Sequence, residues 1–240
     1  LLLLADIESD PSDTRSLRAL DTISDQFIDR DSNIYSLGRS HFPIPCLNGN
    51  MLYLHAYFGS DKNRMTEGII DFFHDHQRFD DGDFKTPSTF PYFSNKSCYG
   101  KHTCYWGVTK LLKGLSFIPK NQRSKKASEL LSQCVEFVLL HEVCFSSRTP
   151  SEFIHKRIAQ LTFPTMYHTD ILELLWILKR EQVQSPRIER ALELLKGKKG
   201  PDETWQMEHS VTDLIVPLAG KGMGAHFITK RAHEVLEFYS

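Results

Sequence analysis

The chain has 240 residues, of which 40% are hydrophobic and 25% are charged, as in ordinary folded domains. Its 29 Lys and Arg residues nearly balance its 30 Asp and Glu residues, and the net charge is −1. This balance excludes the strongly positive surface that general, sequence-independent binding of nucleic acids requires. Five cysteines, an odd number in a chain of this size, favour free thiols in a reducing compartment, so we expect a cytoplasmic location.

The chain opens on four leucines, residues 1–4, which are followed at once by charged residues. This run is too short for a membrane span or for the apolar region of a signal peptide, so we expect no membrane span. It is typical of the last turns of a helix. Because the chain also begins without Met, we expect a single domain over 1–240 that is truncated at its N-terminus.

An imperfect repeat organises the chain. Each copy is an apolar segment, a short break that contains an arginine, and an amphipathic segment. The arginines are separated by 49, 59 and 64 residues, and they are Arg15, Arg64, Arg123 and Arg187. Periods of this size indicate helical hairpins. We place the copies at about 1–30, 46–84, 98–144 and 168–205, with a closing half repeat at 222–240.

The two segments of each copy differ in their apolar pattern. The amphipathic segment of the fourth copy places Ile188, Ala191 and Leu195 at helical steps, which predicts an outer helix with one face in water. The preceding segment, residues 171–178, is apolar on almost every side, which predicts a helix buried on every side. Alternation of the two kinds predicts an all-α protein with two concentric layers of helices.

Two pieces of the repeat carry a resemblance to a known family. The second copy closes with Gln77-Arg78-Phe79-Asp80-Asp81-Gly82-Asp83-Phe84, and the fourth closes with Gly200-Pro201-Asp202-Glu203-Thr204-Trp205. The first piece is similar to the Gln…Asp-Gly…Trp element of squalene-cyclase-like repeats, with Phe84 in place of Trp. The second piece keeps the Trp. The chain therefore resembles the terpenoid cyclase and protein prenyltransferase superfamily over nearly its whole length.

The resemblance implies a fold and a class of ligand. The implied fold is an α/α toroid, here an incomplete ring of the (α/α)6 type, with the buried helices around a central cavity and their N-termini at one rim. In such families the cavity holds apolar isoprenoid chains. No Asp-x-Asp-Asp element of the squalene-cyclase type occurs, because residues 80–83 stand in another part of the repeat. The resemblance therefore leaves open whether the chain is a transferase, a cyclase-like enzyme or neither.

The starts of the apolar segments are unusually polar and carry residue types that bind zinc. The candidate zinc ligands are Cys98, His102, His168 and Asp170, of which His102, His168 and Asp170 are also candidate acid–base residues. On one continuous helix, Cys98 and His102 would share a face at a step of four, and Cys104 would point away. Two alternatives remain: buried cysteines with His and Asp at helix starts, or a Cys–His nucleophile pair.

A third group of residues is expected to line the cavity, where aromatic faces stabilise a cation or stack on a ligand. These residues are Cys46, Asn50, Tyr53, Tyr105, Trp106 and Trp176. Ordinary core packing is the alternative for the aromatic members.

Two functions follow from these observations. The first is a prenyltransferase-like or terpene-cyclase-like protein that binds a hydrophobic, isoprenoid-like small molecule, with Zn²⁺ as a possible cofactor. The second is a non-catalytic helical-repeat module that binds a partner protein or its own copy.

Overall fold

The structure is a computed structural model that describes residues 1–29, 33–36, 42–59, 63–93, 95–210 and 220–240. The chain divides into two compact units, Leu1–Val135 and Glu136–Ser240, which are treated one at a time below. The middle of the second break, residues 60–62, and the end of the first predicted copy, residue 30, lie outside the described residues. The predictions of a single domain and of a toroid stay predictions.

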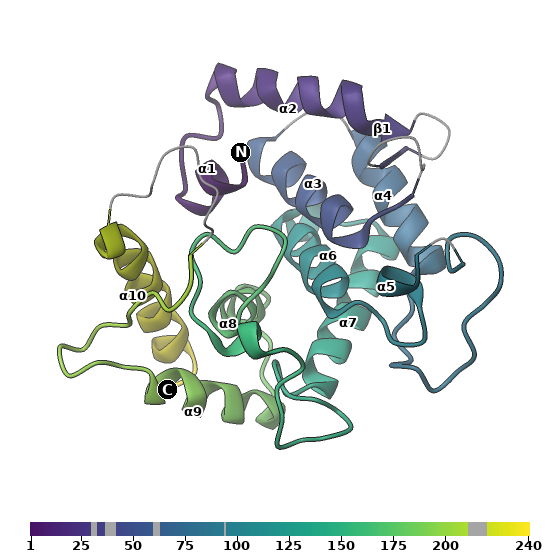
Figure 1. Cartoon of the computed structure of the whole chain (residues 1–240). Coiled ribbons are helices and arrows are strands. Elements are labelled where there is room, and N and C mark those ends of the chain that lie inside the picture. The colour runs from purple at the N-terminus through teal and green to yellow at the C-terminus, as the bar shows by residue number, and fades with distance from the viewer. Residues whose placement is uncertain (30–32, 37–41, 60–62, 94, 211–219) are drawn as a thin grey trace. The chain divides into compact units, whose positions relative to one another are not determined.

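Helices dominate both units, which confirms the all-α class (Figure 1). The first unit contains α1 (Leu2–Asp6), α2 (Thr14–Phe27), α3 (Pro45–Phe58), α4 (Asn63–His76), α5 (Lys96–Tyr99) and α6 (Tyr105–Phe117). The second contains α8 (Ile171–Arg180), α9 (Glu189–Gly197) and α10 (Gly220–Phe238), and α7 (Lys125–Leu140) runs from the first unit into the second. Each predicted copy of the repeat thus holds two described helices with a break between them, and the third copy also includes the end of α5. Helix α10 follows the fourth copy and packs against α8 and α9.

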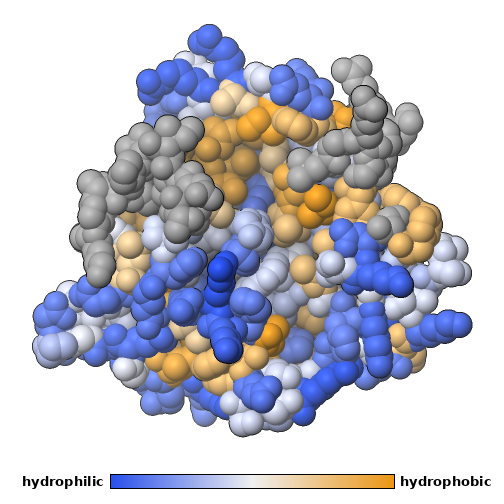
Figure 2. Space-filling view, viewed as in Figure 1, coloured by the Kyte–Doolittle hydropathy of each residue, from blue (hydrophilic) through white to orange (hydrophobic). Residues whose placement is uncertain are grey.

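The helices alternate in burial as their apolar patterns predict. In α3, α6 and α8 most side chains are buried, whereas α2, α4 and α9 bury one face and expose the other. On the face shown in Figure 2, hydrophilic residues cover α2, and hydrophobic residues gather beneath it in the area of α3. The amphipathic spacing of the sequence therefore identified correctly the buried helix of the second, third and fourth hairpins, whereas in the first hairpin only Ala5 and Asp6 of α1 are buried.

Helices α3 and α6 form the most extensive helix–helix contact among the described elements. Two glycines permit their backbones to approach: a Cβ atom on Gly49 would lie 2.3 Å from the carbonyl carbon of Lys110, and one on Gly114 would lie 2.7 Å from the Gly49 oxygen. Nearer the helix starts, a Cβ on Gly107 would lie 2.7 Å from Pro45. The two buried helices therefore run parallel, with their N-termini at the same end.

Side chains in the segments that follow two of the helices donate hydrogen bonds to carbonyl groups at the ends of those helices. In the third copy, Arg123 donates from Nε to the Ile118 oxygen (2.9 Å) and from its guanidinium to the Ser116 oxygen (3.2 Å), which satisfies carbonyls at the end of α6. In the fourth copy, the buried Trp205 donates from Nε1 to the Leu195 oxygen (2.7 Å) at the end of α9. The corresponding Phe84 of the second copy is 69% exposed and does not share this role.

A small departure from the all-helical pattern follows α2. Strands β1 (Ile28–Asp29) and β2 (Ile34–Tyr35) pair antiparallel, with Ile28 opposite Tyr35. The strands are two residues long, which is too short for the alternation that would have predicted them. Asn48 of α3 holds the second strand, because its side chain accepts from the Tyr35 N–H (2.8 Å) and donates to the Tyr35 oxygen (2.9 Å).

The four opening leucines lead into a buried ion pair. Asp6 at the end of α1 accepts a 2.6 Å hydrogen bond from Nζ of Lys113 on α6, and both side chains are at most 3% exposed. Tyr53 of α3 donates its hydroxyl to the same Asp6 oxygen (3.2 Å), and the Lys113 ammonium lies 4.2 Å from the centre of the Tyr53 ring.

Within the part of the chain that the structure describes, no helix is long and apolar enough to cross a membrane.

Candidate functional site

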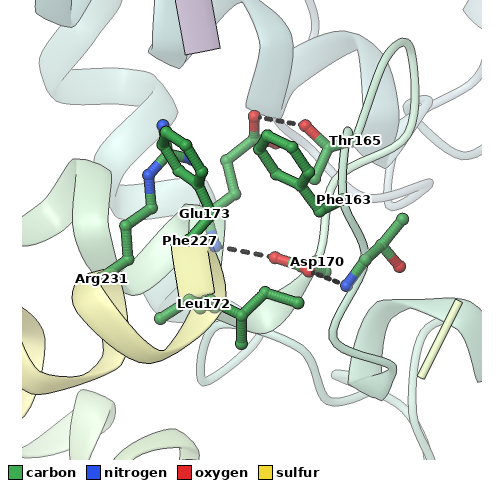
Figure 3. Close-up of a pocket in the computed structure, with 9 residues that line it drawn as sticks. Phe163, Thr165, Asp170, Leu172, Glu173, Phe227 and Arg231 are labelled. Atoms are coloured by element: carbon green, nitrogen blue, oxygen red, sulfur yellow. Dashed lines mark hydrogen bonds between the residues drawn. The ribbon is translucent and has the colours of Figure 1, made fainter. Parts of the chain in front are cut away.

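The predicted polar start of α8 is built around Asp170 (Figure 3). Asp170 is the N-cap of the helix: its Oδ1 accepts from the Glu173 N–H (2.7 Å), and its Oδ2 accepts from the Thr162 N–H (2.7 Å). Both carboxylate oxygens therefore hold backbone groups, one at the helix start and one in the preceding loop. This is the capping role that aspartate commonly has at helix N-termini.

The sequence prediction missed a second carboxylate, Glu173, one turn further along α8. Its side chain is buried, and its two oxygens accept from the hydroxyls of Thr165 (2.7 Å) and Thr169 (2.6 Å). The signal for it was present, because Glu173 is the single charged residue in the apolar run 171–178. A charged residue in such a run is expensive to bury unless it is hydrogen-bonded, as it is here.

Aromatic and apolar side chains surround these carboxylates. The Phe163 and Phe227 rings stack with centroids 4.9 Å apart, and the buried Arg231 lies with its guanidinium 4.6 Å from the centre of the Trp176 ring. Figure 3 shows Phe227 and Arg231 on α10 facing the start of α8. The small pocket between these side chains has a volume of about 10 Å³, which is room for about one water molecule. It is too small for an isoprenoid chain.

The parallel starts of α3 and α6 bring three cysteines together in the first unit. Cys46 is the second residue of α3, Cys104 is the N-cap of α6, and Cys98 lies in the short helix α5. All three are half-buried and free. Burial raises the pKa of Cys46, and the neighbouring Cys104 charge raises it further.

The thiols of Cys98 and Cys104 are hydrogen-bonding neighbours. The hydrogen bond from Cys98 lowers the pKa of Cys104 to about 7, and the N–H groups of Gly107 and Trp106 at the start of α6 assist. The same hydrogen bond raises the pKa of Cys98. The N-terminus of α6 therefore favours the thiolate form of Cys104.

One premise of the zinc hypothesis is wrong. The step of four between Cys98 and His102 presumes one continuous helix, but α5 ends at Tyr99 and residues 100–104 are not helical. The chain turns there, and Cys104, which a continuous helix would point away, contacts Cys98 instead. The sequence offered no direct signal for this turn except Gly100.

The turn between the two cysteines is held by Arg78. This arginine donates to the Gly100 oxygen (3.2 Å), and its own carbonyl accepts from the Thr103 hydroxyl (2.8 Å). Its guanidinium also forms an ion pair with Asp80 at 2.7 Å and donates to the Phe84 oxygen (3.0 Å). Arg78 thereby ties both ends of the 100–103 segment to the Gln77–Phe84 element that carries the family resemblance.

The two histidine candidates lie in different units. His102, in the turn between Cys98 and Cys104, is 49% exposed with Nδ1 3.2 Å from the Asp81 oxygen. The ring of His168 in the second unit is tilted by 37° against that of Tyr167, with centroids 4.0 Å apart. Among the described residues, no group of three or more His, Cys, Asp or Glu side chains is arranged to hold a metal ion. Zinc bound by Cys98, His102, His168 and Asp170, and catalysis by the last three, stay predictions.

The residues expected to line a cavity differ in burial. Tyr53, Tyr105 and Asn50 are buried, with Tyr53 packed edge-on against Phe117 of α6, and Cys46, Trp106 and Trp176 are half-buried. Tyr53 and Trp176 each face a cationic side chain, as described above. Their contact with a ligand stays a prediction.

A groove of about 680 Å³ lies at the opposite end of the α3–α6 pair. Its floor and walls come from the ends of α3 and α6, from α4 and from the start of α7, and the apolar part includes Ala56, Ile70, Ile118, Pro119 and Ala127. His55, Thr66, Glu67, Gln122, Arg123 and Ser124 are the polar part. This volume falls within the range of ordinary small-molecule sites, which is roughly 300–1,000 Å³.

His55 at the floor of the groove is oriented by a chain of buried hydrogen bonds. Ser24 donates to the Leu20 oxygen (2.8 Å) and accepts from the Tyr35 hydroxyl (2.8 Å), and the Tyr35 hydroxyl oxygen lies 2.7 Å from Nε2 of His55. Burial raises the pKa of Tyr35 to about 12, which keeps this hydroxyl a donor at neutral pH.

Comparison of the chain with models of protein families, with curated proteins and with solved structures finds no match.

Proposed function

We propose that this chain binds a hydrophobic small molecule and that the groove between the second and third hairpins is the binding site. The observation that carries the proposal is the preformed groove of about 680 Å³, which lies at the C-terminal ends of the parallel buried helices α3 and α6. Its apolar wall of Ile70, Ile118 and Pro119 suits an isoprenoid-like or similar chain. Glu67 offers a hydrogen-bond acceptor to a polar head group.

The alternation of buried and half-exposed helices and the capping Trp205 support a relation to the squalene-cyclase-like repeats of terpenoid cyclases and prenyltransferases. In this proposal the chain shares the repeat and the ligand class with those proteins. The ligand would bind in the groove at the C-terminal ends of α3 and α6, whereas the resemblance implies a binding site at the N-terminal ends of the buried helices. No reaction is part of the proposal.

Titration with a fluorescent isoprenoid alcohol tests the groove. The wild-type chain is expected to bind with saturation, and Thr66→Phe, which fills the groove from α4, is expected to weaken binding by about tenfold or more because it removes space for the ligand. Thr22→Phe on the exposed face of α2 is the matched control and should bind as the wild type does. Equal affinity of both variants and the wild type would exclude the groove.

A second candidate function, an interaction module that binds its own copy, is favoured by one loop of the first unit. Phe84, Phe90 and Phe93 are 69%, 46% and 63% exposed, although large apolar side chains are costly to leave in water. The loop is braced by Arg78 and by the Tyr92 hydroxyl, which donates to the His76 oxygen (3.0 Å). Exposed aromatic anchors on a braced loop are typical of protein interfaces.

Light scattering over a range of protein concentrations tests this second function. If the loop mediates self-association, the wild-type mass rises with concentration and Phe84→Ser/Phe93→Ser remains monomeric. Tyr167→Ser, which removes a comparably exposed aromatic ring from the second unit, is the control. A wild-type chain that stays monomeric throughout removes the self-association function.

A further inference from the structure

Another pocket of the first unit lies between the long loop that precedes α5 and the turn that follows it (Figure 1). Its volume is about 480 Å³, and it is lined by residues 82–86 and by Lys101. It shares no lining residue with the groove. Small-molecule sites have volumes of roughly 300–1,000 Å³, so this pocket has room for a small ligand of its own.

Arg78 holds the two walls of this pocket in place. Its guanidinium donates to the Phe84 oxygen (3.0 Å) and to the Thr86 hydroxyl (3.0 Å) in the wall formed by the loop. It also donates to the Gly100 oxygen (3.2 Å), next to Lys101 in the opposite wall. Because one largely buried side chain joins both walls, their spacing does not depend on a ligand.

The lining carries cationic groups that the rest of the structure leaves available. Lys85 and Lys101 are exposed, and neither ammonium forms an ion pair with a carboxylate in the described part of the chain. The Thr86 hydroxyl accepts from Arg78, so its own proton can be donated to a ligand oxygen. Asp83 is the one lining residue with a carboxylate. Two ammonium groups against one carboxylate favour an anion with several acceptor oxygens.

The Phe84 ring gives the same pocket an apolar face. The residue is 69% exposed, although its backbone oxygen is held by Arg78, so the ring extends from a braced segment. Aromatic rings stack on one another with an offset, and the contact removes apolar area from water. An exposed ring beside two available cations therefore suits a ligand that joins a planar ring to an anionic group.

We propose that this pocket binds a small aromatic phosphate, that is, a phosphomonoester joined to a planar ring. The phosphate accepts hydrogen bonds from Lys85, Lys101 and the Thr86 hydroxyl, and the ring stacks on Phe84. A phosphomonoester carries a charge of about −1.5 to −2 at neutral pH and three terminal oxygens, which matches three donors of which two are cationic. A carboxylate, with one charge and two oxygens, matches them less well.

Titration of the ¹⁵N-labelled full chain with phenyl phosphate, followed by NMR, tests the proposal. The amide resonances of residues 82–86 and 101 are expected to shift and to saturate. Inorganic phosphate lacks the ring, benzyl alcohol lacks the anion and benzoate lacks the third oxygen, so each is expected to bind at least about threefold more weakly. Absence of saturable shifts at these residues, or binding of any of the three that is as tight as that of phenyl phosphate, would overturn the proposal.

Substitutions of charged residues locate the phosphate. Lys85→Gln and Lys101→Gln are each expected to weaken the binding of phenyl phosphate at least about fivefold, because each removes a charge-assisted hydrogen bond. Asp83→Asn removes the opposing carboxylate and is expected to strengthen binding. Lys96→Gln, at an exposed lysine of α5 outside the pocket, is the matched control. If it weakens binding as much as the two pocket substitutions do, the anion responds to overall charge and the site is refuted.

Further variants separate this site from the two functions proposed above. Thr66→Phe fills the groove and is expected to leave the binding of phenyl phosphate unchanged; loss of binding would place the ligand in the groove and contradict the proposal. Phe84→Ser is expected to weaken binding at least about threefold, because it removes the stacking partner. Phe93→Ser removes an exposed ring outside the pocket and is its control. Equal effects of these two serine substitutions would exclude stacking on Phe84.

Discussion

At the scale of single residues, position relative to a helix end explains most of the chemistry in this molecule. Asp170 and Cys104 occupy the same N-cap position of α8 and α6, yet they differ in what they offer. Both oxygens of Asp170 are engaged by backbone N–H groups, which makes it a structural cap. Cys104 receives similar N–H groups and a neighbouring thiol, which stabilise a thiolate. The same backbone feature thus holds a capping carboxylate in one hairpin and lowers the pKa of a thiol in another.

The pH dependence of alkylation tests the assignment of the charge to Cys104. Because its pKa is lowered to about 7, the rate of Cys104 alkylation by iodoacetamide should reach half its maximum near that pH, below the roughly 8.5 of an ordinary thiol. Cys98→Ala removes the donor and should raise this midpoint, whereas Cys98→Ser keeps a hydroxyl donor and should retain a lowered one. Cys46→Ser is the control and should leave the midpoint low. A midpoint that does not move in Cys98→Ala would contradict the assigned hydrogen bond.

At the scale of helices, close packing of the backbones decides where the buried helices lie. Helices α3 and α6 approach through Gly49 and Gly114, and their parallel direction puts the thiols at one end and the groove at the other. Both candidate sites therefore depend on the same contact. Any change that separates the two helices should disturb both ends.

Substitution of glycine by alanine measures this contact. Gly49→Ala places a Cβ atom 2.3 Å from the Lys110 backbone, so we expect a loss of at least about 2 kcal/mol in the free energy of unfolding, despite the better helix propensity of alanine. Gly197→Ala at the end of α9 meets no atom within 4 Å and is the matched control, expected to be neutral or to gain up to about 1 kcal/mol. Urea denaturation followed by circular dichroism checks both. Equal effects of the two substitutions would show that the close approach is not required.

The closing elements of the second and fourth copies make a second comparison between elements. Trp205→Phe removes the donor to the Leu195 carbonyl inside the protein, and we expect a loss of about 1–3 kcal/mol. Phe84→Ala at the corresponding exposed position should change the free energy of unfolding by at most about 0.5 kcal/mol. The same urea experiment measures both, and a larger effect at Phe84 would mean that the loop packs differently.

The elements also show how far the sequence alone could lead. Helical periodicity predicted the hairpins and their buried members, because a stripe of apolar residues requires a partner surface. It missed the contact of Cys98 with Cys104, since that depends on a helix that stops at Tyr99 and on a turn held by Arg78. It also missed the buried Glu173, because residues 171–178 were interpreted as one continuous apolar segment. Local pattern predicts elements, whereas long-range hydrogen bonds determine the sites.

At the scale of the whole molecule, two compact units of helical hairpins carry the described structure. The first unit holds a preformed groove and the thiol cluster, and the second holds a one-water cavity with buried Asp170, Glu173 and Arg231. The groove, at about 680 Å³, has the volume of a small-molecule site, whereas the cavity of the second unit has room for about one water molecule. The account therefore rests on binding of a hydrophobic ligand in the first unit.

Native mass spectrometry of the full chain, purified without detergent, tests this claim most directly. The account predicts that the wild-type chain retains an apolar small molecule, or takes one up from an added isoprenoid alcohol, at one ligand per chain. Thr66→Phe should lose this ligand and Thr22→Phe should keep it. A wild-type chain that carries no ligand and takes up none, while remaining folded, would contradict the account.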